Sequence, residues 1–175
     1  MILRTFIVLL LGVAVMQCTE PVTKKIAFDK EVAADSINTL LDNWHLLAAK
    51  ADTNYFNKMA ADGVYLGTDA SERWAVSDFK TWAAPYFERG NAWDFKATER
   101  HIEFGAQGKY AWFDELLETW MGTCRGSGVL FYNNGKWEIK QYNLSLMVPN
   151  PAIHEVMDVI ATQQDSTAAT SEEKQ

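Results

Sequence analysis

The sequence predicts an α+β fold in which amphipathic helices pack against one strongly curved antiparallel sheet. Two observations predict it. Apolar residues recur at helical spacing up to about residue 90, and after Asn91 strand-forming runs alternate with short turns. A chain of 175 residues is long enough for one domain with its own core. The apolar stripes of the helices must then be buried against one face of the sheet.

The first eighteen residues predict export. Arg4 precedes an apolar stretch, 6–16, that is too short to cross a bilayer, which takes ~20 apolar residues. The leader ends at Cys18 in a motif that resembles the lipobox of bacterial lipoproteins, although Gln17 stands where a small residue is usual. We therefore expect a protein of the bacterial cell envelope, anchored to the membrane by lipid on Cys18. The alternative is a plain secretory leader and a periplasmic protein.

Composition divides the rest of the chain. Residues 19–27 lack apolar periodicity and predict a tether, residues 28–162 the folded domain, and residues 163–175 a disordered tail. The second cysteine, Cys124, has no disulfide partner if Cys18 carries lipid. We expect its thiol to be buried in the core.

Four helices are predicted from spacing and capping residues. The first is capped by Asp29 and continues to about Ala51, and the second is capped by Thr53 and ends at 62–63. A brief strand over 64–66 follows. A third helix is capped by Ser77 and stopped by Gly90, and a short last helix is capped by Asn150.

Four strands are predicted between the third and last helices, over residues 93–104, 109–121, 124–132 and 136–148. The connections between them are so short that neighbouring strands must be antiparallel. The four strands therefore form a meander.

The order of the predicted elements and several short sequence motifs resemble the SnoaL-like branch of the nuclear transport factor 2-like superfamily over roughly residues 35–150. They are Tyr65-Leu66-Gly67-Thr68-Asp69, Trp112-Phe113-Asp114-Glu115, Arg125-Gly126-Ser127-Gly128 and Gln141-Tyr142-Asn143-Leu144-Ser145. The resemblance implies a cone-shaped sheet that encloses a pocket at its open end, and commonly a dimer through the outer face of the sheet. It does not imply one activity, because the fold hosts isomerases, cyclases, dehydratases, carriers and association domains.

The candidate catalytic residues are Asp114 and Glu115. Neighbouring side chains on a strand point to opposite faces, so one of the two carboxylates is expected among aromatic residues. Burial there would raise its pKa and suit it to act as a general base. The alternative is a structural ion pair with Arg125 on the next strand.

The candidate pocket residues come from four segments. Alternation in the last strand places Gln141 and Asn143 on one face with Trp137, where they orient a ligand or satisfy backbone groups of a loop. The segment 67–74 is expected to arch over the open end of the sheet. The full set of expected pocket residues is His45, Tyr65, Asp69, Trp74, Trp112, Arg125, Gln141 and Asn143.

Composition and motifs exclude several function classes. The formal charge of −7, without a cluster of Lys and Arg, argues against a nucleic-acid binder. Three scattered histidines and the absence of HExxH predict no metal site, and we expect no cofactor. Three functions remain: a pocket protein for a small, partly apolar ligand, an isomerase or cyclase that uses a pocket carboxylate as base, and a homodimeric assembly module.

Overall fold

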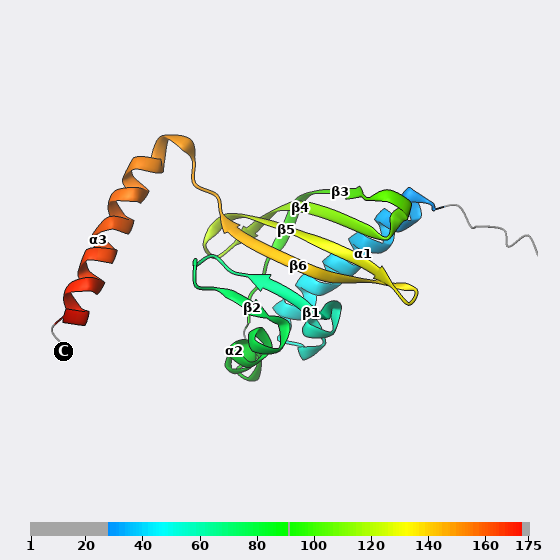
Figure 1. The fold of residues 1–175 in the computed structure, drawn as a ribbon, viewed down its shortest axis with the longest axis horizontal. Coiled ribbons are helices and arrows are strands. Elements are labelled where there is room, and N and C mark those ends of the chain that lie inside the picture. The colour runs from blue at the N-terminus through cyan, green and yellow to red at the C-terminus, as the bar shows by residue number, and fades with distance from the viewer. Residues whose placement is uncertain (1–27, 91, 173–175) are drawn as a thin grey trace, which may run out of the picture.

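The computed structural model describes residues 28–90 and 92–172, with the backbone alone for 165–172 (Figure 1). The predictions for residues 1–27 lie outside this part of the chain. The elements follow in the order α1 (Lys30–Ala49), η1 (Thr53–Lys58), β1 (Met59–Leu66), β2 (Arg73–Ala75), α2 (Val76–Glu88), β3 (Lys96–Phe104), η2 (Ala106–Gly108), β4 (Tyr110–Thr119), β5 (Gly122–Asn133), β6 (Lys136–Leu146), η3 (Asn150–Ala152) and α3 (Ile153–Glu172).

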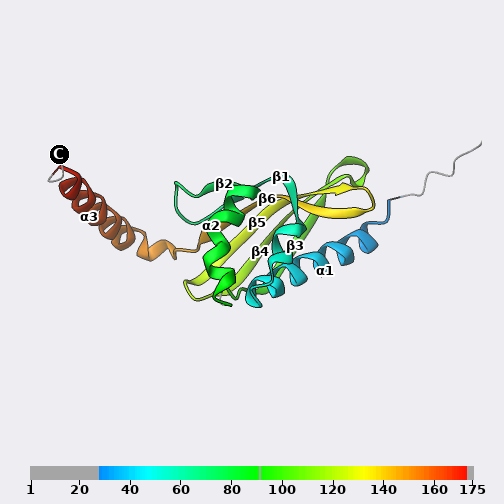
Figure 2. The same ribbon diagram turned by 90° about the horizontal axis from the view of Figure 1, so that it is seen from below.

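One six-stranded sheet has the strand order β2-β1-β6-β5-β4-β3. The antiparallel meander from β3 to β6 is confirmed. The sheet as a whole is mixed, because β1 pairs with β6 in parallel and β2 pairs with β1 antiparallel. A parallel pair needs a long connection, which α2 and the rest of the meander provide. Figures 1 and 2 show α1 and α2 on the same side of the sheet. We call the face they cover the inner face.

The helix α1 forms as the sequence predicts. Asp29 accepts hydrogen bonds from the backbone N–H groups of Glu31 and Val32, which otherwise lack partners in the first turn. The apolar stripe of α1 turns toward the sheet, with Ile37 and Trp44 fully buried. The N-terminal half of the domain is therefore anchored by one long helix.

The second predicted helix is shorter than expected. It is the 3-10 helix η1, capped by Asp52 instead of Thr53, and it ends at Lys58. The chain then enters β1 directly, so the predicted stop at 62–63 lies inside a strand. The register between β1 and β6 shifts between Met59 and Val64. The irregular stretch obscures the strand signal in the sequence.

The third predicted helix begins without a side-chain cap. Its N-cap residue is Ala75, whose side chain makes no capping hydrogen bond, and Ser77 lies within the first turn of α2. The short strand β2 was not predicted, and it leads straight into this helix. Gly90, with φ of +70°, follows the last residues of α2 and ends it as predicted.

The core is dominated by aromatic rings on the inner face of the sheet. Trp44 stacks on Tyr55 with ring centroids 4.7 Å apart and meets Tyr142 edge-on at the same separation. Tyr55 also contacts Phe56 and Phe87, which ties η1 to α2. Such pairs contribute ~0.5–1.5 kcal/mol each beyond the burial of their area. Cys124 is fully buried on β5 with a free thiol, as expected.

A β-bulge in β6 decides which side chains face the helices. Val129 of β5 pairs with Gln141, while the next residue, Leu130, pairs with Ile139, so Lys140 is an extra residue on β6. An extra residue reverses the alternation beyond it. Trp137 and Ile139 are buried before the bulge, and Tyr142 and Leu144 are buried after it. Gln141 and Asn143 therefore face the outer side of the sheet, and their predicted position in the cavity is wrong.

The C-terminal helix is longer than predicted. α3 extends to Glu172 and so covers much of the stretch 163–175, which the sequence assigned to a disordered tail. Its main contacts are with η3, and Figure 1 shows it projecting away from the sheet. Its apolar residues Ile153, Met157 and Ile160 are exposed.

Candidate functional site

A cavity of about 290 Å³ lies at one end of the domain, between the β1–β2 hairpin, α2 and the turn that joins β4 to β5. We call it the open-end pocket. Four tryptophans and four other aromatic residues make up much of its wall. The lining residues are Tyr65, Gly67, Thr68, Glu72, Trp74, Phe79, Trp82, Tyr86, Ala92, Trp93, Phe95, Trp120, Met121 and Leu144.

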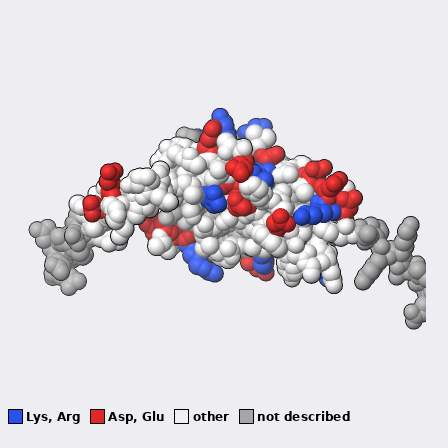
Figure 3. All heavy atoms as spheres, turned by 90° about the horizontal axis from the view of Figure 1, so that it is seen from above, with Lys and Arg blue, Asp and Glu red and all other residues white. Residues whose placement is uncertain are grey.

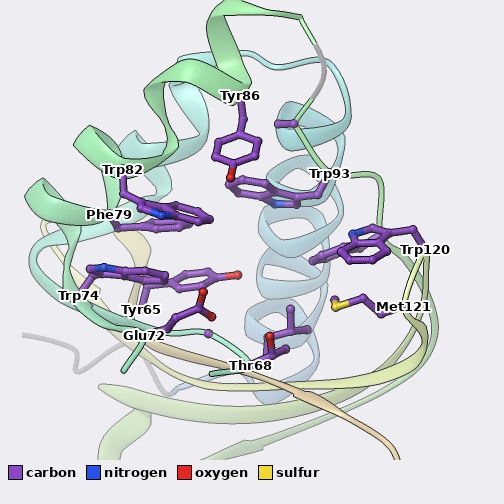
Figure 4. A pocket seen from close by; sticks show the side chains of 14 residues that line it. Tyr65, Thr68, Glu72, Trp74, Phe79, Trp82, Tyr86, Trp93, Trp120 and Met121 are labelled. Carbon is purple, nitrogen blue, oxygen red and sulfur yellow. The ribbon is translucent and has the colours of Figure 1, made fainter. Parts of the chain in front are cut away.

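One side of the pocket is a layered stack of rings. Tyr65 lies flat against Phe79 with centroids 3.9 Å apart, and Trp74 lies flat against Trp82 at 4.8 Å. Figure 4 shows these rings on one side of the cavity and Trp120 on the other. Because the rings of the stack hold one another, this wall is preformed for an apolar or aromatic ligand surface.

The carboxylate of Glu72 is the charged group in this wall. Its Oε2 accepts a hydrogen bond of 3.2 Å from the backbone N–H of Asp69. Figure 4 shows the carboxylate beside the hydroxyl of Tyr65, which points toward the cavity. Burial, with the nearby charge of Glu72 as a second cause, raises the pKa of Tyr65 well above its ordinary value. The hydroxyl is therefore neutral at physiological pH and serves as a hydrogen-bonding group.

A separate polar cluster lies within the core, around Glu115. Its Oε1 is 2.7 Å from Nε2 of His45 on α1, and its Oε2 accepts a 2.8 Å hydrogen bond from Nε of Arg100 on β3. Nη2 of Arg100 also lies 2.8 Å from Oε2, as an ion pair outside hydrogen-bond geometry. Nη1 of Arg100 reaches Asp42 and Asn38 of α1. We call His45, Arg100 and Glu115 the buried cluster.

The buried cluster contradicts the predicted rise in the pKa of a core carboxylate. Desolvation does raise the pKa of Glu115, but the hydrogen bonds and charges of His45 and Arg100 outweigh it and hold the pKa below the usual range. Both oxygens are engaged and the side chain is fully buried. Glu115 is thus an ionised structural partner, and it does not line the open-end pocket.

The other candidate base, Asp114, lies on the outer face of the sheet. Its Oδ1 is 3.8 Å from Nη1 of Arg125 and 3.6 Å from Nδ1 of His101, so it takes part in the ion pair that was the alternative to catalysis. Arg125 and Trp112 are on the same face and about half exposed. Asn143 there donates to Oγ of Ser145. Four expected pocket residues therefore lie on the outer face, away from the pocket: Trp112, Arg125, Gln141 and Asn143.

Two of the expected pocket residues, Tyr65 and Trp74, line the open-end pocket. Asp69 is in the adjoining loop but does not line the pocket. Hydrogen bonds from the side chain and backbone of Ser71 hold the pKa of Asp69 below its usual range. His45 borders a different surface cavity, of about 320 Å³, between α1 and β3.

Most of the pocket wall was missed because its aromatic residues were assigned to core packing. Trp120 is the clearest case. The sequence placed it in a strand that ended at Met121, whereas the turn between β4 and β5 comes earlier and presents Trp120 to the pocket with 82% of its surface exposed. The available signal was the gathering of tryptophans near three connections, at Trp74, Trp93 and Trp120.

Two kinds of special site are absent from the described residues. Within residues 28–90 and 92–172, no group of three or more His, Cys, Asp and Glu side chains is arranged to hold a metal ion. None of the described helices is long and apolar enough to cross a membrane.

The profile of the SnoaL-like domain family matches residues 37–149, which is more than half of the chain. The chain belongs to the SnoaL-like domain family. The match spans the elements from within α1 to the end of β6, including the open-end pocket and the buried cluster. The resemblance to the SnoaL-like branch, which was drawn from four short sequence motifs, is thereby confirmed.

Solved structures support the nuclear transport factor 2-like fold of this SnoaL-like domain. A nuclear transport factor 2-like protein of unknown function from Pseudomonas putida superposes with a TM-score of 0.59 at 14% identity, over 69% of this chain and 90% of that one. A protein provisionally named a scytalone dehydratase, from Novosphingobium aromaticivorans, gives 0.57 at 10% identity, over 67% and 86%. At such identities the likeness concerns the fold alone. A search of curated proteins gave no match.

Proposed function

We propose that this SnoaL-like domain is an exported, lipid-anchored protein that binds a small, partly apolar molecule in the open-end pocket. The observation behind the proposal is the wall of eight aromatic residues around a cavity of about 290 Å³. Ligand sites are typically concave and mostly apolar, with a few convergent polar groups. The pocket fits this description, with the carboxylate of Glu72 and the hydroxyls of Tyr65, Thr68 and Tyr86 as its polar groups.

Binding without chemistry is favoured over isomerase or cyclase activity. The predicted general base for such an activity is Asp114 or Glu115, and neither residue lines the open-end pocket. Both oxygens of Glu115 are held by His45 and Arg100. A general base must come within hydrogen-bond reach of the proton it removes, and this one is enclosed in the core.

Replacing Trp120 by Ala tests the pocket. We expect ligands from a panel of small, partly apolar molecules to raise the melting temperature of the wild-type protein. Losing one wall ring should weaken their binding roughly threefold to tenfold, on the scale of one aromatic contact of ~0.5–1.5 kcal/mol. Trp120 is largely exposed, so its removal should spare the fold. Thermal shift and titration calorimetry measure both effects.

The matched control is Trp112→Ala, which removes a half-exposed tryptophan from the outer face, away from the pocket. Its ligand affinity should equal that of wild type. If no member of a broad panel stabilises the wild-type protein, the binding function is wrong.

Lipid anchoring rests on the leader sequence and is tested through Cys18. We expect the full chain, expressed in a bacterium with a lipoprotein pathway, to partition into membranes, and the Cys18→Ser protein to lose this partition. Fractionation followed by mass spectrometry of the N-terminal peptide measures both. Identical processing and membrane association of the two proteins would exclude lipid on Cys18.

A homodimer is the second candidate, and it is favoured by the outer face of the sheet. Tyr110 and Trp112 are each about half exposed there, beside Val129 and Phe131 on the neighbouring strand. The ring centroids of Tyr110 and Phe131 are 5.0 Å apart, so the apolar surface is continuous across the two strands. A second copy of this apolar surface would cover the exposed rings.

Figure 3 shows one face of the molecule with acidic and basic side chains interspersed and no broad basic patch.

A further inference from the structure

The carboxylate in the open-end pocket has no cationic partner. The residues that line the cavity include no Lys, Arg or His. In the described part of the chain, no basic side chain lies within ion-pair distance of Glu72. A negative charge beside apolar rings, with no positive group to balance it, is an incomplete arrangement that a cationic ligand would complete.

The loop before β2 holds Glu72 in this position. Its backbone carbonyl accepts a 2.9 Å hydrogen bond from the N–H of Gly67, and its Oε2 accepts one from the N–H of Asp69. A side chain at Gly67 would overlap the carboxylate, so glycine leaves the space that Glu72 occupies. The placement of the charge is therefore built by the loop and does not depend on a freely rotating surface side chain.

We propose that the open-end pocket binds an organic cation, with an alkylated ammonium group seated against the tryptophan rings and paired with Glu72. The proposal rests on the binding function proposed above for the same pocket. Aromatic rings attract cations through the negative charge of their faces, and indole does so most strongly. Trp74, Trp82, Trp93 and Trp120 provide four indoles, and Tyr65 and Tyr86 provide two phenols. An alkylated ammonium group suits such walls because its methyl groups make apolar contacts. An anionic ligand would be repelled by Glu72, and no positive side chain in the pocket wall would offset that repulsion.

Choline and its uncharged isostere 3,3-dimethylbutan-1-ol test this proposal, because they share a shape and differ in charge. We expect the full-length protein, purified in nonionic detergent at fixed ionic strength, to bind choline at least about tenfold more tightly than the isostere. In Glu72→Gln the preference should fall to about onefold to threefold, since the charge is lost and the rings remain. Titration calorimetry measures both affinities.

Glu88→Gln is the matched control, because it removes one negative charge from an exposed position on α2 that does not line the pocket. It should keep the wild-type preference for choline. The comparison of the two ligands on wild-type protein stands alone if Glu72→Gln fails to fold.

The outcomes separate the two proposals. Equal or tighter binding of the uncharged isostere to wild type would overturn the organic cation and leave the pocket function standing. A preference for choline that persists in Glu72→Gln would overturn the role of Glu72. If neither probe nor any member of the broader panel binds, both the pocket function and the cation fail together.

Discussion

Replacing Glu115 by Gln is expected to lower the free energy of unfolding by about 3–5 kcal/mol, the usual cost of removing one partner from a buried ion pair. The carboxylate is fully buried and engages His45 and Arg100. A Gln amide has one acceptor oxygen in place of two and no charge to balance Arg100, so the contacts with His45 and Arg100 cannot both be kept as they are. Chemical denaturation followed by tryptophan fluorescence measures the change.

Acid dependence gives a second readout of the same variant. The pKa of Glu115 is lower in the folded protein than its ordinary value of 4.5. Its contribution to stability is therefore complete above about pH 4.5 and is lost as the pH falls through the folded pKa. Wild type should lose stability over that acid range, and Glu115→Gln should lack this component while being less stable at neutral pH.

The neighbouring carboxylate supplies the control. Asp114 is 42% exposed and makes only long contacts of 3.6 and 3.8 Å on the outer face. Asp114→Asn should therefore change the free energy of unfolding by no more than about 0.5 kcal/mol. Equal losses for Asp114→Asn and Glu115→Gln would contradict the assignment of the buried cluster.

Replacing Trp112 by Glu is expected to convert a homodimer into monomers. In a symmetric dimer each substitution occurs twice, and a central tryptophan typically contributes at least ~2 kcal/mol to an interface. The combined loss of about 4 kcal/mol corresponds to roughly 1,000-fold weaker association. Sedimentation velocity over a range of concentrations measures the mass of wild type and variant.

Leu46→Glu is the control for added charge, because Leu46 is an exposed apolar residue on α1, away from the outer face of the sheet. It should leave the dimer intact. A wild-type mass of one chain at high concentration would exclude the homodimer, and dissociation by Leu46→Glu alone would place the interface elsewhere.

The sequence predicts the layers of this fold well because their signals are local. The stripe from Ile37 to Ala48 defines α1, and the short turns define the meander. The turn at Asn134 and Gly135, both with positive φ, is of the kind that tight hairpins require. The parallel pairing of β1 with β6 was not predictable in this way, because it joins residues far apart in the chain and leaves no mark on local spacing.

The site was harder to predict because small irregularities decide which face a side chain takes. One extra residue at Lys140 turned Gln141 and Asn143 outward. Alternation alone did predict that Asp114 and Glu115 lie on opposite faces. It gave no information on Arg100 and His45, which reach Glu115 from another strand and from α1, and so the direction of the pKa shift was wrong.

The buried cluster also bears on how α1 finds its place along the sheet. An apolar stripe tolerates sliding, because one leucine-sized group can replace another over the same surface. Hydrogen bonds do not, and a slide of one helical turn, about 5.4 Å, would carry His45 out of reach of Glu115. The carboxylate would then be buried beside α1 with a partner missing. The cluster thus fixes the register of α1 on the sheet. It selects one alignment of helix and sheet among several that the apolar contacts alone would accept.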